Sequence, residues 1–370
     1  MVVKLPKHSK MAPTQGGTQG GVDYKLTTFL QGSLTLDDYV WSQEEWPKVA
    51  YNDYNDEDTV PIIDISLLRS EDAATRSKGL KDLMEAAREW GFFRLVNHGV
   101  LSDVTEKLES DGKELFALPL EQKKKAVRLP ESIIGYYFGA ESVFSKAWLE
   151  AFHFSGDKEV TDNMIRQVSP ENFNELSASV HNYIDAYQKL AIEVVELMAI
   201  ALGLEPSTFS KYTATKGDKS TVRVCYYPPC PQPQQTLGQR PHADPILITI
   251  VHQDDVGGLQ ILKNNRWIAV KPEPGTVVVN VGDTLQVLSN DIYPSVQHQV
   301  VLNSERSRLS MAFFLIPEAD ALIVPAKGLV DDEHPVRHPP FIYRDYRKSY
   351  GERRAVGKSH LESFYTLKDA

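Results

Sequence analysis

The chain has 370 residues, and its 40 basic and 50 acidic side chains give a formal net charge of −10 at pH 7. This acidic balance argues against a surface that follows nucleic-acid phosphates, so no nucleic-acid partner is expected. Two cysteines are too few for a secreted disulfide framework. No apolar run approaches the roughly 20 residues that cross a bilayer, and the basic start lacks the apolar stretch of a signal peptide. We therefore expect a cytoplasmic protein without a membrane partner.

Residues 58–205 carry mainly helical patterns, after a polar, Gly-rich stretch at 1–22 that predicts a flexible tail. Apolar residues at helical spacing alternate there with short apolar runs that favour strands. These patterns predict strands at 60–65 and 91–96, and helices at 73–90, 103–117, 121–127 and 174–203.

The pattern changes after about residue 220, where short β-branched runs are separated by turn residues such as Gly257-Gly258 and Asn264-Asn265. Strands are predicted at 221–227, 246–252, 258–262, 267–270, 276–281, 296–302 and 308–316. Many short, regularly spaced strands favour a double-sheet architecture over a parallel α/β sheet. The charged and aromatic segment from about residue 340 predicts a helix packed on the barrel.

The predicted fold class is therefore α+β, with a double-stranded β-helix (jelly roll) core, a helical amino-terminal region and a carboxy-terminal helix. We divide the chain into a flexible tail and lead-in at 1–57, a mainly helical region at 58–205, the jelly-roll core at 206–320, and a carboxy-terminal cap and helix at 321–370.

The segment 241–245, Pro-His-Ala-Asp-Pro, carries the first candidate site. His242 and Asp244 are two residues apart, so on an extended segment their side chains point to the same side. His-x-Asp alone is weak, because a surface loop can contain it by chance. His298 follows on the strand predicted at 296–302. Two histidines and one carboxylate on one face of a metal leave three positions open, which is typical of non-haem Fe(II) oxygenases.

Arg308 and Ser310 form a second candidate site on the strand predicted at 308–316. Their spacing of two residues places both side chains on one face of that strand. A planar guanidinium beside a hydroxyl suits the bidentate capture of a carboxylate inside a barrel. The pair is therefore a candidate for holding the far end of a dicarboxylate.

Together with these candidate site residues, the sequence motifs of residues 58–350 resemble the plant-type 2-oxoglutarate-dependent dioxygenases, the superfamily of flavonoid, gibberellin and alkaloid oxygenases. The motifs that carry the resemblance are VPIIDI at 60–65, EWGFFRLVNHG at 89–99, YYPPCP at 226–231, VGGLQ at 256–260 and VVNVGD at 278–283.

The resemblance implies Fe(II) held by His242, Asp244 and His298, with 2-oxoglutarate as co-substrate, O2 as oxidant and ascorbate as a supporting reductant. It also implies that Tyr227 binds the far carboxylate of 2-oxoglutarate together with Arg308 and Ser310, although Tyr227 as an ordinary barrel aromatic stays open as an alternative. The expected reaction converts 2-oxoglutarate to succinate and CO2 while a small molecule is hydroxylated or desaturated. A monomer is expected.

One position departs from the resemblance. The family usually has Asn where this chain has Cys225. Residues behind metal ligands help to orient them, so a polar contact that the family makes there is in doubt in this chain.

Three further positions are candidates for substrate contact. Phe314 shares the strand face of Arg308 and Ser310, and in similar flavonoid enzymes the matching position stacks on the substrate ring; packing in the core is the alternative. Arg223 shares a strand face with Tyr227, and its match in the family lies beside the substrate. Tyr136 is expected on a loop that similar enzymes fold over the pocket.

The other chemical side chains are interpreted as structural. No Gly-x-Gly-x-x-Gly opens a helix, so Gly282-Asp283 is interpreted as a turn and not as a phosphate loop. His98 is interpreted as closing a turn and His252 as lying on a predicted strand, while His153, His334 and His338 have no partner at ligand spacing.

Three functions remain open from the sequence. The preferred hypothesis is a flavonoid oxygenase of the flavone synthase or flavanone hydroxylase type, which Phe314 and the aromatic segment around Tyr136 favour. The alternative is a hormone oxidase acting on a carboxylate-bearing substrate such as a gibberellin, with Arg223 as the anchor. A non-catalytic, metal-bearing jelly-roll binding protein is a third hypothesis, and an intact Arg308 and Ser310 argue against it.

Overall fold

The computed structural model describes residues 35–55, 58–129, 132–139, 146–214, 220–352 and 360–368. The flexible tail predicted at 1–22 lies outside these ranges. Within them, no helix has both the length and the apolar character needed to cross a membrane.

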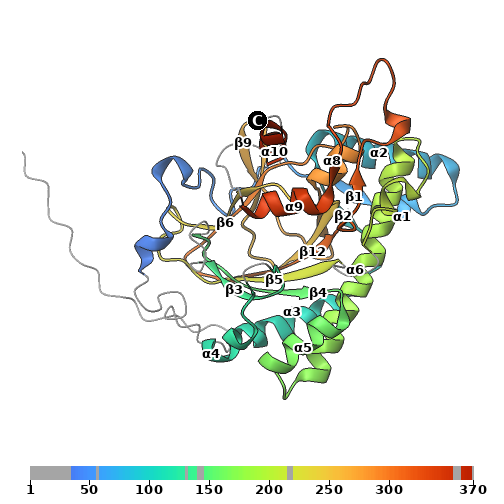
Figure 1. Ribbon diagram of the computed structural model, residues 1–370. Coiled ribbons are helices and arrows are strands. Elements are labelled where there is room, and N and C mark those ends of the chain that lie inside the picture. Colours follow the sequence, from blue (N-terminus) through green and yellow to red (C-terminus); the bar gives the residue numbers. More distant parts are fainter. Residues whose placement is uncertain are drawn as a thin grey trace, which may run out of the picture.

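The described strands form a large sheet of eight strands, a smaller sheet of four and a two-stranded ribbon (Figure 1). The large sheet has the order β1 (Ile62–Asp64), β2 (Phe92–Val96), β10 (Val277–Val281), β7 (Ile248–Gln253), β12 (Arg308–Leu315), β5 (Thr221–Tyr227), β4 (Glu150–Ser155) and β3 (Gly135–Phe138). The smaller sheet has the order β6 (Leu237–His242), β11 (His298–Val301), β8 (Leu259–Lys263) and β9 (Arg266–Ala269). The ribbon pairs β13 (Leu322–Ile323) with β14 (Phe341–Ile342).

The two larger sheets pack against each other through buried side chains. Phe92 and Val278 of the large sheet share one apolar cluster with Leu259 and Ile261 of the smaller sheet. Strands β1 and β2 pair in parallel, whereas the other pairings within these sheets are antiparallel. Helices on one side of two facing antiparallel sheets confirm the predicted α+β class.

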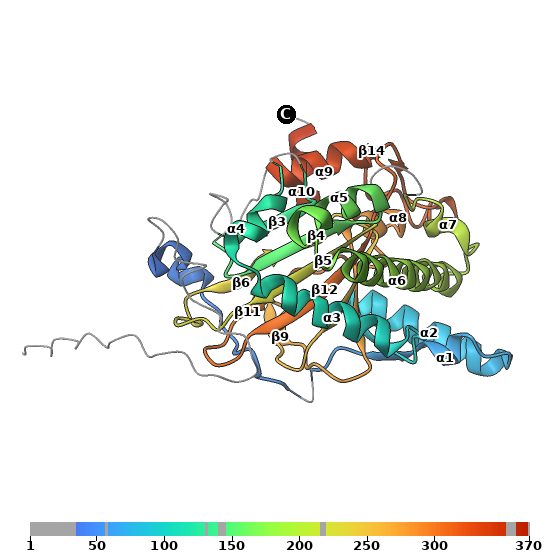
Figure 2. The ribbon, with the colours of Figure 1, turned by 90° about the horizontal axis from the view of Figure 1, so that it is seen from below.

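The longer helices α2, α3 and α6 lie along the large sheet (Figure 2). The helices are α1 (Ile65–Leu68), α2 (Ala73–Trp90), α3 (Ser102–Ala117), α4 (Leu120–Lys123), α5 (Lys158–Val168), α6 (Phe173–Ala201), α7 (Ser207–Ser210), α8 (Asp283–Leu288), α9 (Tyr343–Glu352) and α10 (His360–Lys368). The predicted helices at 73–90, 103–117 and 174–203 are confirmed within one or two residues.

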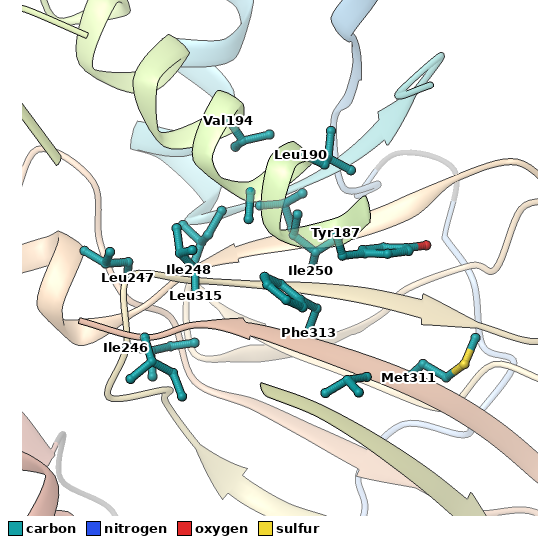
Figure 3. Close-up of a cluster of buried hydrophobic side chains, with 14 of the residues drawn as sticks. Tyr187, Leu190, Val194, Ile246, Leu247, Ile248, Ile250, Met311, Phe313 and Leu315 are labelled. Atoms are coloured by element: carbon teal, nitrogen blue, oxygen red, sulfur yellow. The ribbon is translucent and has the colours of Figure 1, made fainter. Parts of the chain in front are cut away.

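Alternation along β12 divides its side chains between two environments. Met311, Phe313 and Leu315 point toward α6 and pack with Leu190 and its neighbours in a buried apolar cluster (Figure 3). Because successive side chains of a strand point to opposite faces, Arg308, Ser310 and Phe314 face the interior between the sheets. The packing of α6 therefore fixes which side chains of β12 point inward.

Three predicted elements are corrected by the structure. The helix predicted at 121–127 is only α4, followed by a 3-10 turn at Lys124–Ala126. Lys123 is the last residue of α4, and its buried ammonium donates to the Phe116 carbonyl at 3.0 Å and to the Glu150 carboxylate at 2.6 Å. Gly282-Asp283 is not a simple turn, since Gly282 caps α8 and Asp283 is its first residue. Tyr136 lies on strand β3 and not on a loop.

We expect Leu190→Ala on α6 to lower the free energy of unfolding by about 2–5 kcal/mol, because it leaves a cavity between α6 and the large sheet. Leu190 is 3% exposed, whereas Leu322 is 52% exposed. The same change at Leu322 should therefore cost less than about 0.5 kcal/mol. Urea unfolding followed by circular dichroism measures both values, and equal losses would contradict the packing described for α6.

Candidate metal and co-substrate site

His242, Asp244 and His298 meet at one end of the smaller sheet. His242 is the last residue of β6 and His298 the first of β11, and the two are register partners across these antiparallel strands. Asp244 follows β6 by two residues. One possible ligand atom from each side chain lies within 4.8 Å of the other two, and within the described ranges no other set of three such side chains is this close. Sheet register thus brings together residues far apart in the sequence.

Both imidazole rings are oriented by backbone carbonyls. Nδ1 of His242 lies 2.8 Å from the Arg240 carbonyl oxygen, and Nδ1 of His298 lies 3.3 Å from the Val296 carbonyl oxygen. A carbonyl only accepts, so each Nδ1 carries the hydrogen and each Nε2 keeps a free lone pair. The His242 Nε2 is 3.6 Å from Oδ1 of Asp244, and the His298 Nε2 is 3.8 Å from its Oδ2. Both Nε2 atoms therefore lie near the Asp244 carboxylate with a lone pair free to bind a metal, as ligation requires.

Asp244 is buried and its carboxylate is held on one side. Thr249 donates its hydroxyl to Oδ2, and Asn280 donates its amide to the same oxygen at 2.9 Å, which leaves Oδ1 free. Burial raises the pKa of Asp244, but His298, His242 and these two hydrogen bonds outweigh it and lower the pKa below its usual value. Burial and the neighbouring His298 also lower the pKa of His242. A neutral imidazole and an ionised carboxylate are the forms that bind a metal.

Arg308 lies in the interior, 3% exposed, opposite Tyr227 in the β12–β5 register. Its Nη1 donates to the Ser310 hydroxyl at 3.1 Å and its Nη2 to Oε1 of Gln253 at 2.9 Å, while its guanidinium carbon lies 5.1 Å from the centre of the Tyr227 ring. Nε has no partner among the described residues, and no carboxylate among them forms an ion pair with this arginine. The Asp254 carboxylate interacts with this charge from beyond ion-pair distance, so the unpaired donors of the buried guanidinium favour an anionic ligand.

Tyr227 lies beside this arginine. Burial raises the pKa of its phenol above the usual value, so the hydroxyl keeps its hydrogen. The structure therefore brings Tyr227, Arg308 and Ser310 together, as the resemblance implies. Cys225 pairs in register with Ser310 and is buried.

The candidates for substrate contact separate into two groups. Arg223 and Phe314 lie together, with the guanidinium carbon 5.6 Å from the ring centre. Tyr136 points the other way, because its ring packs on Phe152 at 4.9 Å within the cluster under the helices. Its neighbour Tyr137 accepts a hydrogen bond from Nη1 of Arg223 at 3.3 Å.

Several residues of this site were not found from the sequence. His153 was interpreted as structural, yet it pairs in register with Arg223 and its ring lies 5.6 Å from that of Phe314. Gln253 and Asn280 touch Arg308 and Asp244 through sheet pairings that no local pattern indicates. Tyr137 could have been found by alternation, if residues 135–138 had been interpreted as a strand.

Comparison with known proteins decides the family. Residues 219–317 match the 2OG-Fe(II) oxygenase superfamily, and residues 60–175 match the family described as non-haem dioxygenase in morphine synthesis N-terminal. The chain is 34% identical over 311 residues to gibberellin 20 oxidase 1-A of Triticum aestivum, covering 83% of this chain and 84% of that protein. It is 35% identical over 307 residues to jasmonate-induced oxygenase 4 of Arabidopsis thaliana, covering 81% and 86%. The chain belongs to the 2OG-Fe(II) oxygenase superfamily.

Solved structures agree with this oxygenase over most of its length. The crystal structure of JOX2 in complex with 2OG, Fe and JA superposes with a TM-score of 0.77 at 31% identity, covering 92% of this chain and 97% of that one. The dioxygenase for auxin oxidation in rice gives a TM-score of 0.68 at 27% identity, covering 82% and 99%. The jelly-roll prediction is confirmed. The protein is a 2-oxoglutarate-dependent dioxygenase with Fe(II) as its metal.

Replacing His242, Asp244 or His298 by Ala should each reduce Fe(II)-dependent succinate release by at least about 100-fold, since even groups behind a ligand contribute about 10–100-fold. His334→Ala is the control, because that side chain is 66% exposed and pairs with Asp331. Circular dichroism should show that all four variants fold. A ligand variant that kept the activity of the original enzyme would remove that residue from the site.

Arg308→Gln should raise the KM for 2-oxoglutarate at least about tenfold, because a buried charge-assisted hydrogen bond is worth about 1.5–3 kcal/mol and about 1.4 kcal/mol corresponds to tenfold. Arg306→Gln is the matched control, since Arg306 is 57% exposed and pairs with Asp255 at the surface. Steady-state kinetics at saturating substrate measures both. An unchanged KM in the Arg308 variant would place this arginine outside the co-substrate site.

Proposed function

We propose that this oxygenase is a hormone oxidase that acts on a small carboxylic acid, whose carboxylate is held by Arg223. The observation that carries the proposal is a second guanidinium, half-buried, with no described carboxylate within ion-pair distance. Among the described residues, Nη1 of Arg223 donates to the Tyr137 hydroxyl and Nε has no partner. No carboxylate in the described ranges forms an ion pair with it. Such a cation is stabilised by an anion that enters with the substrate.

The surroundings of Arg223 keep it charged. Burial lowers the pKa of its guanidinium, but Tyr137, Cys225, Tyr227 and Asp244 favour the charged form and hold the pKa well above its usual value. The contribution of Asp244 also indicates that Arg223 is near the metal site. A carboxylate bound there would place the rest of a small substrate close to the metal.

Two more arginines add positive charge to the same region. Burial lowers the pKa of His153 well below its usual value, and the charges of Arg223, Arg347 and Arg128 lower it further. His153 is therefore neutral at pH 7, while three cations act on it from β5, α9 and the segment before β3. This concentration of positive charge supports an anionic substrate.

Separate residues would bind the carboxylate of 2-oxoglutarate and that of the substrate. Arg308, Ser310 and Tyr227 would hold the far carboxylate of 2-oxoglutarate, and Arg223 would hold that of the substrate. His242, Asp244 and His298 would hold the iron. Iron and 2-oxoglutarate, when bound, supply the oxidation, in which O2 and 2-oxoglutarate give succinate and CO2 while a substrate C–H bond is oxidised. Phe314 would pack against the apolar part of the substrate and keep water away from it.

The relatives support this proposal over the flavonoid hypothesis. Their names include gibberellin oxidases and jasmonate-induced oxygenases, and the JOX2 structure holds JA beside 2OG and Fe. The flavonoid hypothesis depended on Phe314 and Tyr136, and Tyr136 packs away from the site. Membership of an oxygenase family also argues against a non-catalytic binding protein.

Succinate release should be measured with a jasmonate, a gibberellin, the methyl esters of both, and a flavanone. We expect a free acid to be turned over and its methyl ester to be at least about tenfold poorer in kcat/KM, because esterification removes the charge that Arg223 binds. Turnover of the flavanone alone, or equal turnover of acid and ester, would contradict the proposal.

Arg223→Gln should raise the KM of the accepted acid at least about tenfold and leave the KM for 2-oxoglutarate within about twofold. Phe314→Ala removes apolar contact only, so it should have the smaller effect on the acid. Loss of 2-oxoglutarate binding in the Arg223 variant would instead place this arginine in the co-substrate site.

A further inference from the structure

The segment that carries two of the candidate metal ligands is held by its backbone carbonyls. Five successive carbonyl oxygens, from Ala243 to Leu247, each accept a hydrogen bond from elsewhere in the chain. The donors are the Tyr350 hydroxyl to Ala243 at 2.7 Å, the Asp283 amide to Asp244 at 2.8 Å, the Thr284 hydroxyl to Pro245 at 2.9 Å, the Thr284 amide to Ile246 at 3.2 Å, and the Gly282 amide to Leu247 at 2.9 Å.

Four of these donors belong to the turn that begins α8, and this turn lies directly on the segment. A Cβ added to Gly282 would lie 2.1 Å from the Ile246 carbonyl oxygen and 3.0 Å from that of Asp244. Only glycine therefore allows the approach. The fifth donor, Tyr350, comes from α9 and binds the carbonyl between His242 and Asp244.

Helix α9 also contacts the α8 turn directly. Tyr346 donates its hydroxyl to Oδ2 of Asp283 at 2.6 Å, and the amide of this same aspartate holds the Asp244 carbonyl. Tyr346 and Tyr350 are four residues apart, so they share one face of the helix. Two hydroxyls from α9 thus reach the metal-ligand segment, one directly and one through Asp283.

Helix α10 fixes the position of α9. The two helices lie side by side (Figure 1), and the ring of His360 on α10 is 5.0 Å from the rings of both Tyr346 and Tyr350. Ser349 of α9 also forms a hydrogen bond with Nε2 of His360 at 3.0 Å. The two hydroxyls are therefore carried by a packed pair of helices.

We propose that α9 is a positioning element for the metal site, in which Tyr350 and Tyr346 hold the His242–Asp244 segment in the geometry that binds the ion. The inference rests on the proposed assignment of His242, Asp244 and His298 as metal ligands. Neither tyrosine hydroxyl contacts a candidate ligand side chain, so both are positioning residues. Ligands held in place before the ion arrives bind it more tightly, because less ordering remains to be done on binding.

A purely structural role makes a different prediction. Loss of any buried tyrosine hydroxyl that donates to a carbonyl lowers the stability of the metal-free protein. If the hydroxyl positions the metal ligands, its loss weakens metal binding as well. Tyr293 is the matched control, since it is fully buried and donates to the Met198 carbonyl of α6 at 3.0 Å.

The experiment uses the full chain and Co(II), whose visible d–d spectrum reports ligand geometry. The variants are Tyr350→Phe, Tyr346→Phe, Tyr293→Phe and His242→Ala, each titrated with Co(II) and each unfolded in urea without metal. We expect Tyr350→Phe and Tyr346→Phe to bind Co(II) about three- to tenfold more weakly, with an altered d–d spectrum. Tyr293→Phe should lose similar stability and keep the original affinity and spectrum.

Original affinity and spectrum in both α9 variants would overturn the proposal, as would an equal loss of affinity in Tyr293→Phe. If one α9 variant does not fold, the other decides. His242→Ala separates this result from a failure of the site assignment: if it binds Co(II) like the original protein, the assigned ligands are wrong and the inference is withdrawn with them.

Discussion

A carboxylate buried between two imidazoles, at Asp244, is the constraint on which much of this fold depends. Removing a charge from water costs several kcal/mol unless the protein replaces the lost solvation. Here hydrogen bonds donated by Thr249 and Asn280 replace part of it, and a metal shared with His242 and His298 would supply the rest. These partners come from four different strands, so the charge can be stabilised only when the register between those strands is correct.

The interior of the barrel contains the polar and charged side chains of the candidate site. The outer face of the large sheet is apolar and packs under helices. The same strand β12 serves both environments. Arg308 and Ser310 face inward, and Met311 and Phe313 pack under α6. Arg308 and Arg223 lie on the neighbouring strands β12 and β5, and the Asp244 carboxylate favours the charged form of Arg223. A shift of β12 by one residue would exchange the two sets of side chains.

Sequence reasoning was most successful where chemistry follows a local period. The spacing of two in His242-x-Asp244 and Arg308-x-Ser310 was enough to predict shared faces, and the apolar period of α6 was enough to predict a long helix. It failed where a short strand is buried on both faces. Phe152 and Phe154 of β4 alternate with His153 and Ser155, but all of Glu150–Ser155 is buried, so the strand was missed and His153 with it. Tyr136 was predicted to contact the substrate, but it packs on Phe152, and the next residue, Tyr137, contacts Arg223 instead. Successive side chains of a strand point to opposite faces, so an error of one residue reverses the predicted direction. Gln253 and Asn280 depend on pairings between distant strands, which only the folded structure supplies. The domain limits, the monomeric state and the cytoplasmic location stay predictions.

The position of α9 along the chain has a consequence for the order of assembly. Domains fold as the chain is synthesised, and their earlier segments emerge first. The two candidate ligands near residue 243 emerge long before Tyr350, which donates to the Ala243 carbonyl, and Tyr346, which donates to the Asp283 carboxylate. A nascent chain that has released its whole jelly roll therefore still holds an unfinished ligand segment. Iron captured before α9 docks would therefore bind to a looser ligand segment.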